Sequence, residues 1–483
     1  MSKARNASRK RSSRARRDGA KKNDNSRQIR DAMNWLLSPG ILDGLAFHGN
    51  TSWLATELVA LALLWVWSNC PKLTDAFDDA RAQSVKLLGK AALTSYQGLA
   101  GALQTWTSRF MPLLQIQLHE RMAQIGQRHL RVGRWVAIAV DGSRATTPRT
   151  VSNEEAFCAK NYGHGKTAKY RKKKTKGLRR RKNAMAKPQP QAPQIWITMM
   201  WHIGLGMPWC WKLGPSNASE RQHVMEMIAS GHFLKNTLFV GDAGFVGYEF
   251  WKFIIEQGHN FLVRVGANVH LLETLGFYSK QKKGIVYCWP NAAMSKELPP
   301  LVLRLVKCRI GRKRNVYLLT SVLDEAKLRC KEVKKLYQQR WGVELEFRAL
   351  KQTFERRKLR SRKNERALVE MEWSIFGMAV IELFALQQQL PAKRANPHKL
   401  SFAKSLGAVR QSLKHLDDRP DHVGDLTTLL QAAVVDNYER KRSKAARYKP
   451  KNKDKPSCGN PKVSRATAEH RRKLKQLDLQ NAA

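Results

Sequence analysis

Four side chains of the segment 336–354 carry groups suited to phosphate chemistry: the phenol of Tyr337, the guanidinium of Arg340, the carboxylate of Glu344 and the ammonium of Lys351. The apolar residues of this segment recur with the period of an α-helix. At about 100° per residue, the four side chains fall within an arc of roughly 60° on that helix. A single helix is therefore expected to present one carboxylate and two cations together, a set that suits a metal ion beside phosphates.

The same helix has a neighbouring apolar stripe, made of Val343, Phe347, Leu350 and Phe354. Such a stripe predicts that the helix buries this face against a core. The four polar side chains would then lie at the rim of the buried face.

Two aspartates follow short apolar runs earlier in the chain. Residues 134–140 (RWVAIAV) lead into Asp141, and residues 237–240 (TLFV) lead into Asp242. Such runs are typical of buried strands, whose carboxyl ends meet at one edge of an open α/β sheet. Together with Glu344, the two aspartates could hold two divalent ions about 4 Å apart for phosphodiester chemistry. Two Mg²⁺ ions are the expected cofactors, with Mn²⁺ as the substitute, because Mg²⁺ prefers oxygen ligands and shares its shell with phosphates.

Each of these signals also has a purely structural interpretation. An Asp-Gly pair after a strand is usually a turn, and an Arg and a Glu four residues apart on a helix commonly form a surface ion pair. The order of the three acidic residues, two at strand ends and one on a helix, favours a site.

The charge balance points to a polyanionic partner. The 483 residues include 88 Lys and Arg against 38 Asp and Glu, a formal charge of +50. Such a field attracts nucleic acids, so DNA or RNA binding is expected. A ribosomal or nucleoid protein, which needs only charge, is the simpler alternative.

The cysteines and the hydropathy pattern predict the cellular compartment of the protein. The seven cysteines include no C-x-x-C pair, which argues for reduced thiols and against a zinc site. The basic N-terminus lacks the apolar run of a signal peptide. The longest apolar run, Leu58–Trp67, falls short of the roughly 20 residues of a membrane span. A soluble cytoplasmic protein is expected.

The spacing Tyr337-x2-Arg340-x3-Glu344-x6-Lys351 resembles the Tyr-Arg-Glu-Lys signature of DDE transposases of the IS-four type, which are bacterial insertion-sequence transposases. Asp141 in VDGSR and Asp242 in FVGDAGF are similar to the first and second aspartates of that family. The resemblance extends over residues 130–390. It implies an α/β fold: a ribonuclease-H-like catalytic core with a β-rich insertion before the helix of the catalytic Glu, flanked by helical N- and C-terminal regions.

The resemblance also implies a function, cut-and-paste transposition of DNA by hydrolysis and strand transfer. Asp141, Asp242 and Glu344 would be the catalytic metal ligands, and Tyr337, Arg340 and Lys351 would bind DNA phosphates. The partners would be double-stranded DNA, at element ends and at targets, and a second copy of the chain in the DNA complex, near the bacterial nucleoid. Trp289 would either stack on a flipped base or be a core aromatic.

The domain organisation follows from changes in composition. Residues 1–30 read as a disordered basic tail, 31–130 as a helical region for recognition of DNA ends, and 131–390 as the catalytic domain with its β-rich insertion at 267–322. Residues 391–437 read as a helical region for dimerisation, and 438–483 as a second basic tail.

Two basic stretches are candidates for phosphate binding. The loop 160–188 could clamp DNA or be merely solvated; its members are Lys169, Arg171, Lys172, Lys173, Lys174, Arg179, Arg180 and Arg181. A shorter stretch after the Glu helix could extend the same track, through Arg356, Arg357, Lys358, Arg360, Arg362 and Lys363.

Two other functions remain open from the sequence. One is a catalytically silent DNA-binding descendant of a transposase. The other is a ribonuclease-H-like nuclease that cuts DNA without rejoining it.

Overall fold

The computed structural model describes residues 25–38, 40–48, 51–158, 192–276, 284–310, 314–392, 395–416, 424–436 and 459–482. The chain divides into two compact units. The first is made of Met1–Gln117, Val380–Ala395 and Lys399–Val435, and the second of Leu118–Ala379, Asn396–His398 and Asp436–Ala483.

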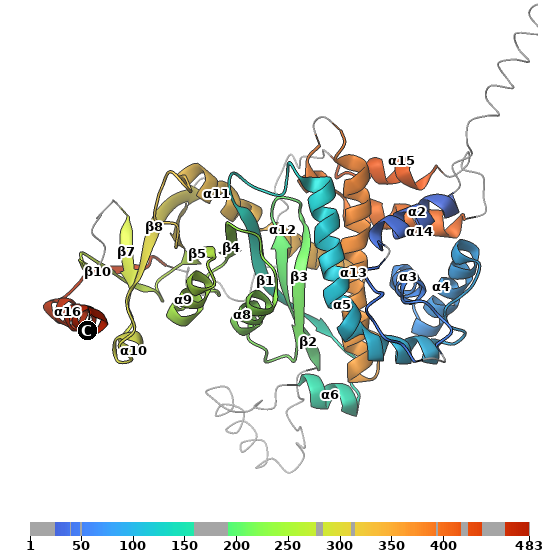
Figure 1. Ribbon diagram of the computed structural model, residues 1–483, viewed down its shortest axis with the longest axis horizontal. Coiled ribbons are helices and arrows are strands. Elements are labelled where there is room, and N and C mark those ends of the chain that lie inside the picture. Colours follow the sequence, from blue (N-terminus) through green and yellow to red (C-terminus); the bar gives the residue numbers. More distant parts are fainter. Residues whose placement is uncertain are drawn as a thin grey trace, which may run out of the picture. The chain divides into compact units, whose positions relative to one another are not determined.

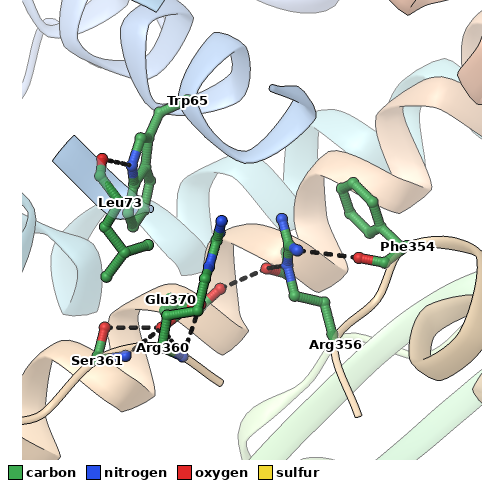
Figure 2. Close-up of polar contacts among 8 residues, drawn as sticks. Trp65, Leu73, Phe354, Arg356, Arg360, Ser361 and Glu370 are labelled. Carbon is green, nitrogen blue, oxygen red and sulfur yellow. Dashed lines mark hydrogen bonds and ion pairs between the residues drawn. The ribbon is translucent and has the colours of Figure 1, made fainter. Parts of the chain in front are cut away.

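The first unit is helical (Figure 1). Its helices are α2 (Asn25–Leu36), α3 (Ala55–Trp67), α4 (Leu73–Leu88), most of α5 (Tyr96–Gly126), the end of α13 (Asn364–Gln389), α14 (Phe402–Lys414) and α15 (Leu426–Gln431). Helix α3 is buried from Leu58 to its end, as the apolar composition of that stretch requires. The indole N–H of Trp65 donates to the carbonyl of Leu73 at 3.2 Å, which fixes the start of α4 (Figure 2).

N-terminal and C-terminal helices pack together within this unit. The side-chain oxygen of Asn25 accepts from the backbone N–H of Leu426 at 3.1 Å, and the rings of Trp67 and Phe384 lie 6.4 Å apart. The helical regions expected at 31–130 and 391–437 therefore share one core. Among the described helices, none is long and apolar enough to span a membrane.

The second unit is built on one mixed sheet, in the order β10-β6-β7-β8-β9-β5-β4-β1-β2-β3 (Figure 1). Strands β1, β4 and β5 are parallel, β2 and β3 continue antiparallel from β1, and β9 pairs antiparallel with β5. The strands are β1 (Val136–Thr146), β2 (Gln194–His202), β3 (Met207–Gly214), β4 (Thr237–Gly241), β5 (Asn260–Val265), β6 (His270–Glu273), β7 (Ile285–Cys288), β8 (Leu301–Ile310), β9 (Arg314–Thr320) and β10 (Lys462–Arg465).

Strands β6 to β9 occupy the stretch 267–322, which the sequence predicts to be β-rich. Strand β10 pairs in parallel with β6, and α16 (Ala468–Ala482) follows it. Part of the predicted tail 438–483 is thus ordered. The free backbone groups of β6 at a sheet edge provide a pairing partner that the composition of the tail does not reveal.

The remaining helices of this unit are α6 (Val151–Phe157), α8 (Glu220–Ser230), α9 (Tyr248–Glu256), α10 (Asn291–Met294), α11 (Cys330–Gln339) and α12 (Gly342–Arg348), with a π-helix at Ala349–Thr353. The prediction of one continuous helix through 336–354 is therefore wrong. Backbone bonds three residues apart, such as Glu344 N–H to Trp341 O at 3.1 Å, tighten the turn between α11 and α12. Packing against the sheet outweighs the local preference for a regular helix.

Close packing explains the start of α12. A β-carbon on Gly342 would lie 2.0 Å from the ring of Trp201 on β2. Only glycine allows the backbone to approach that ring so closely. The predicted apolar stripe of α12 and the π-helix is confirmed, because all four of its members are buried: Val343, Phe347, Leu350 and Phe354.

A buried carboxylate anchors the segment that follows the π-helix. Glu370 of α13 is 1% exposed. It accepts hydrogen bonds from the backbone N–H groups of Arg360 and Ser361, from the Ser361 hydroxyl at 2.7 Å and from Arg360 Nε at 3.2 Å (Figure 2). Arg356 bonds to Ser374 at 2.7 Å and to the carbonyl of Phe354 at 2.9 Å. These contacts hold the end of the π-helix against α13.

Replacing Glu370 by Ala should destabilise the protein by about 3 kcal/mol, because four donors lose their acceptor in a buried setting. Urea-induced unfolding would measure the loss. Glu365→Ala, at an exposed position in the first turn of the same helix, should cost far less. Equal effects of the two variants would contradict a specific anchoring role.

Candidate active site

The two aspartates lie at the same level of neighbouring parallel strands. The β1–β4 register pairs Ala139 with Val240, and Asp141 and Asp242 each follow two residues later. Strand β1 does not end before Asp141, as the apolar run suggests, but continues to Thr146 because β2 extends its pairing. Asp141 therefore lies where the parallel pairing stops and the antiparallel pairing continues.

Glu344 of α12 joins the aspartates at one open cavity of about 550 Å³. A sheet edge and a helix that is distant in sequence thus bring the three predicted carboxylates together. The wall of the cavity also contains cationic and polar side chains. Its lining residues are Asp141, Gly142, Ser143, Asp242, Glu344, Phe347, Arg348, Lys351, Gln352 and Arg357.

Arg340 pairs with Glu344, its Nη2 lying 2.8 Å from Oε1. Although Arg340 is only 7% exposed, its Nε and Nη1 have no hydrogen-bond acceptor in the described part of the chain. Its guanidinium carbon lies 5.6 Å from the ring centre of Tyr337. The tight turn between α11 and α12 thus leaves a buried cation, two of whose donors are unpaired among the described residues, beside the carboxylate of Glu344.

Lys351 extends from the π-helix and donates a hydrogen bond to the hydroxyl of Ser143, two residues after Asp141 on β1. Burial, together with the nearby charge of Arg357, lowers the pKa of Lys351. Ser143 was not among the predicted site residues. Its place two residues beyond Asp141 on the same strand is the only sequence signal for it.

Burial and the neighbouring carboxylates raise the cost of ionising Asp141. Burial raises the pKa of Asp141 to about 6, and the charges of Asp242 and Glu344 add to the rise. A hydrogen bond from the Gly142 backbone and the charge of Arg340 oppose it. Burial is the largest cause of the raised pKa of Asp141, and the three cations that line the cavity with it, Arg348, Lys351 and Arg357, do not prevent the rise.

Glu220, at the start of α8, is a further carboxylate beside these residues, and the sequence reasoning missed it. Burial raises the pKa of Glu220 to about 7, with further contributions from Asp141 and Asp242, while Arg144 opposes the rise. In the sequence, Glu220 is simply an acidic residue directly after Ser219, the N-cap of α8, and such a pattern predicts the start of a helix, not a site.

This donor set fits divalent cations bound through oxygen. Among the described residues, no three His, Cys, Asp or Glu side chains converge on a single ion. A two-ion site needs no such cluster, because Mg²⁺ is usually held by one or two carboxylates and completes its shell with water and substrate phosphates. Asp141, Asp242 and Glu344 in one cavity satisfy that requirement.

Other predicted binding residues are placed differently. Lys172, Lys173, Arg179 and Arg180 lie outside the described residues, as does the rest of the loop 160–188. Of the later basic stretch, Arg357 lines the cavity, whereas Arg356 and Arg360 make the structural contacts around Glu370 described above.

Trp289 is 4% exposed, and its indole N–H donates to the carbonyl of Leu298 at 2.7 Å. A base could stack on this ring only if the side chain left its buried place. The structure therefore favours the core-aromatic interpretation of Trp289.

Comparisons with known proteins agree with the residue signature. Residues 193–378 match the family model described as the transposase DDE domain; this range contains Asp242 and Glu344, whereas Asp141 precedes it. Transposase InsG for insertion sequence element IS4, from Escherichia coli (strain K12), is 24% identical over 318 residues, which are 61% of this chain and 63% of that protein. The chain thus spans less than two thirds of that relative. The resemblance to DDE transposases of the IS-four type is confirmed.

Among solved structures, the piggyBac transposase synaptic complex with hairpin DNA is similar at 12% identity and a TM-score of 0.38, covering 82% of this chain and 79% of that one. A likeness at this score carries no argument about the fold.

The electrostatics of the cavity predict how pH affects stability. Because the folded state raises the pKa of Asp141 from 3.8 to about 6, ionising it opposes folding, and stability should fall as the pH rises through 6. At pH 8 without metal, Asp141→Asn should therefore be more stable than the wild type, by on the order of 2 kcal/mol. Near pH 4 this advantage should vanish.

Thermal unfolding in EDTA at the two pH values would test this. Asp324→Asn, which lies away from the cavity, is the matched control. Added Mg²⁺ should stabilise the wild type and not the Asp141 variant. If Asp141→Asn is no more stable than the wild type at pH 8, burial and the neighbouring carboxylates do not oppose the ionisation of Asp141 as described.

Proposed function

We propose that this protein, a relative of the DDE transposases of the IS-four type, is a DNA transposase. It would move an insertion sequence by cut-and-paste transposition, through two-metal phosphodiester hydrolysis and strand transfer. The observation that carries the proposal is the meeting of Asp141, Asp242 and Glu344 at one open cavity with a partly cationic wall. Phosphoryl transfer needs such a place, where metal ions and phosphates can bind together.

The proposed fold is ribonuclease-H-like. Strands β3-β2-β1-β4-β5 would form its central sheet, with β1, β4 and β5 parallel and β2 and β3 antiparallel. Strands β6 to β9 would be the insertion between the second Asp and the helix of the catalytic Glu. In this arrangement Asp141 follows the part of β1 that pairs with β4, Asp242 follows the carboxyl end of β4, and both lie near α12.

Asp141, Asp242 and Glu344 would hold two Mg²⁺ ions. When bound, the ions supply activation of an attacking oxygen and stabilisation of a leaving oxygen. Asp242 is prepared for this role by its own loop, because its Oδ1 already accepts from the backbone N–H of Gly244 at 2.7 Å. That bond fixes the direction of the carboxylate before any ligand arrives.

Arg340 is the proposed phosphate ligand with the strongest support from geometry. Its buried Nε and Nη1 lack acceptors in the described residues while Nη2 binds Glu344. A buried donor without a partner is costly, and a phosphate oxygen would supply the missing acceptor. Lys351, held by Ser143, and Tyr337, beside Arg340, would contribute a second charge and a hydroxyl.

The proposed partners are DNA and a second copy of the chain. Double-stranded DNA would bind through the first unit at element ends and through the cavity at the scissile bond, and Lys172, Lys173, Arg179 and Arg180 would clamp it. Two copies would act together, because both ends of an element must be held at once. With a formal charge of +50, the protein would associate with the nucleoid of a bacterial cytoplasm.

The two rival functions make different predictions for one assay. Purified protein would be incubated with Mg²⁺ and the DNA that borders its own gene, then with target DNA. A transposase joins the cut ends to the target, a nuclease only cuts, and a silent descendant does neither while still binding.

Asp242→Ala should abolish Mg²⁺-dependent cleavage in this assay and leave binding to the bordering DNA within about threefold, because a single carboxylate contributes little to phosphate affinity. Cleavage would be followed on gels, and binding by fluorescence anisotropy. Asp324→Ala, outside the cavity, is the control. A parallel loss of binding would mean that Asp242 acts through the structure instead.

Arg340→Ala should lower the cleavage rate at least tenfold and reduce the slope of log K against log salt by about one, as expected for one lost phosphate contact. Arg340→Lys should keep the slope but recover only part of the rate, because a point charge cannot serve a carboxylate and a phosphate at once. Arg465→Ala, on the exposed strand β10, is the control for charge alone. An unchanged slope in Arg340→Ala would remove this residue from the phosphate contacts.

A further inference from the structure

Glu220 approaches both aspartate loops from the first turn of α8. A β-carbon on Gly142 would lie 2.2 Å from its Oε1. A β-carbon on Gly244 would lie 4.0 Å from its Oε2 and 3.0 Å from Oδ1 of Asp242. The Glu220 carboxylate therefore spans the backbone next to Asp141 and the loop that holds Asp242.

Glu220 reaches these loops from one face of the sheet, whereas α12 lies on the opposite face. Side chains alternate between faces along a strand, and cross-strand partners share a face. Gly142 pairs with Thr198, whose hydroxyl lies 2.9 Å from Nδ1 of His223 on α8, so position 142 faces α8. Ser143, in contact with Lys351, faces the other side. Because residue 142 has no side chain, Glu220 can reach the edge where the metal ligands meet.

Glu220 has no partner that accounts for this position. Within the described residues it makes no hydrogen bond or ion pair, and the charged groups that affect its pKa are Asp141, Asp242 and Arg144. The guanidinium of Arg144 instead lies over the ring of Trp196, 4.3 Å from its centre. A half-buried carboxylate beside two others is stabilised by taking up a proton or by a cation that lies between the three groups.

We propose that Glu220 is a positioning residue of the metal site, which accepts hydrogen bonds from water molecules on the ion held by Asp141 and Asp242. This inference rests on the proposed function, since it presupposes a divalent ion in the cavity. Mg²⁺ keeps several of its waters in proteins. Groups that bond to the ligands of an ion orient them and raise the affinity for the ion.

Stability alone offers a competing explanation of Glu220. A carboxylate in the first turn of a helix interacts favourably with the helix dipole, so a variant could lose activity merely through α8. The test therefore uses metal binding without DNA as its first measurement, and a second acidic residue of the same helix as its control.

The first experiment titrates Mn²⁺ into the full-length protein and follows the free ion by electron paramagnetic resonance. Glu220→Gln should weaken the binding of Mn²⁺ about tenfold, the lower end of the effect of such orienting groups. Glu226→Gln, on the same helix but paired with Lys212 at 2.6 Å, should bind as the wild type does. Asp141→Asn should lose the site altogether.

Gly142→Ala tests the same idea without altering Glu220. Its new methyl group would collide with the carboxylate and with Cγ of Glu220. Because all of these atoms belong to one flexible side chain, the protein should fold and Glu220 should be displaced. The variant should weaken the binding of Mn²⁺ as Glu220→Gln does, and the double variant should be no weaker than either alone.

Cleavage provides a second measurement. In Glu220→Gln the half-saturating concentration of Mg²⁺ should rise about tenfold, and the rate should approach that of the wild type when Mg²⁺ is saturating. A purely structural defect would lower the saturated rate and would not be rescued by metal.

The outcomes separate this inference from the proposed function. If the wild type binds Mn²⁺ through Asp141 and Glu220→Gln binds it equally well, the role of Glu220 is overturned and the metal site stands. A loss that Glu226→Gln shares would also overturn it. If the wild type binds no Mn²⁺ through Asp141, the metal site of the proposed function and this inference fail together.

Discussion

The parallel register between β1 and β4 is the constraint on which the candidate site depends. It sets Asp141 and Asp242 at one level of neighbouring strands, where burial and mutual repulsion raise the pKa of Asp141 to about 6. Both strands are buried and apolar, so their packing can support this unfavourable pair. In the proposed function, a bound divalent cation would offset this cost of ionising Asp141. Local strain of this kind is characteristic of functional sites.

Departures from regular helix geometry place the cations. Arg340 lies at the tight turn between α11 and α12, where it reaches Glu344 while two of its donors stay without acceptors in the described residues. Lys351 lies in the π-helix, from which it contacts Ser143 of β1. Segments of π-helix cost stability and are common at functional sites. The segment that follows the π-helix is fixed by Glu370, which accepts hydrogen bonds from the backbone N–H groups of Arg360 and Ser361.

Two glycines allow close packing around the sheet. Gly342 lets α12 approach the ring of Trp201, and Gly142 leaves room for the carboxylate of Glu220. They act on opposite faces of β1 and β2, so the cavity is shaped from both sides. The formal charge of +50 acts at longer range, attracting a polyanion without setting its position. In the proposed function, affinity for nucleic acid and chemistry at the cavity would therefore have separate physical origins.

The sequence by itself determined the features that rest on local pattern. Strands β6 to β9 lie in the stretch predicted to be β-rich, the apolar stripe of α12 and the π-helix is buried, and Asp141 and Asp242 follow the short apolar runs that mark buried strands. Contacts between distant segments decided the rest. Pairing with β2 extends β1 past Asp141, and β10 pairs with β6. Helix α12 packs against Trp201, and Lys351 of the π-helix bonds to Ser143. Glu220 enters the site only through such a contact. The physical reason is range, because periodicity reports how a segment buries its own apolar face, whereas register and close approach depend on partners remote in the chain.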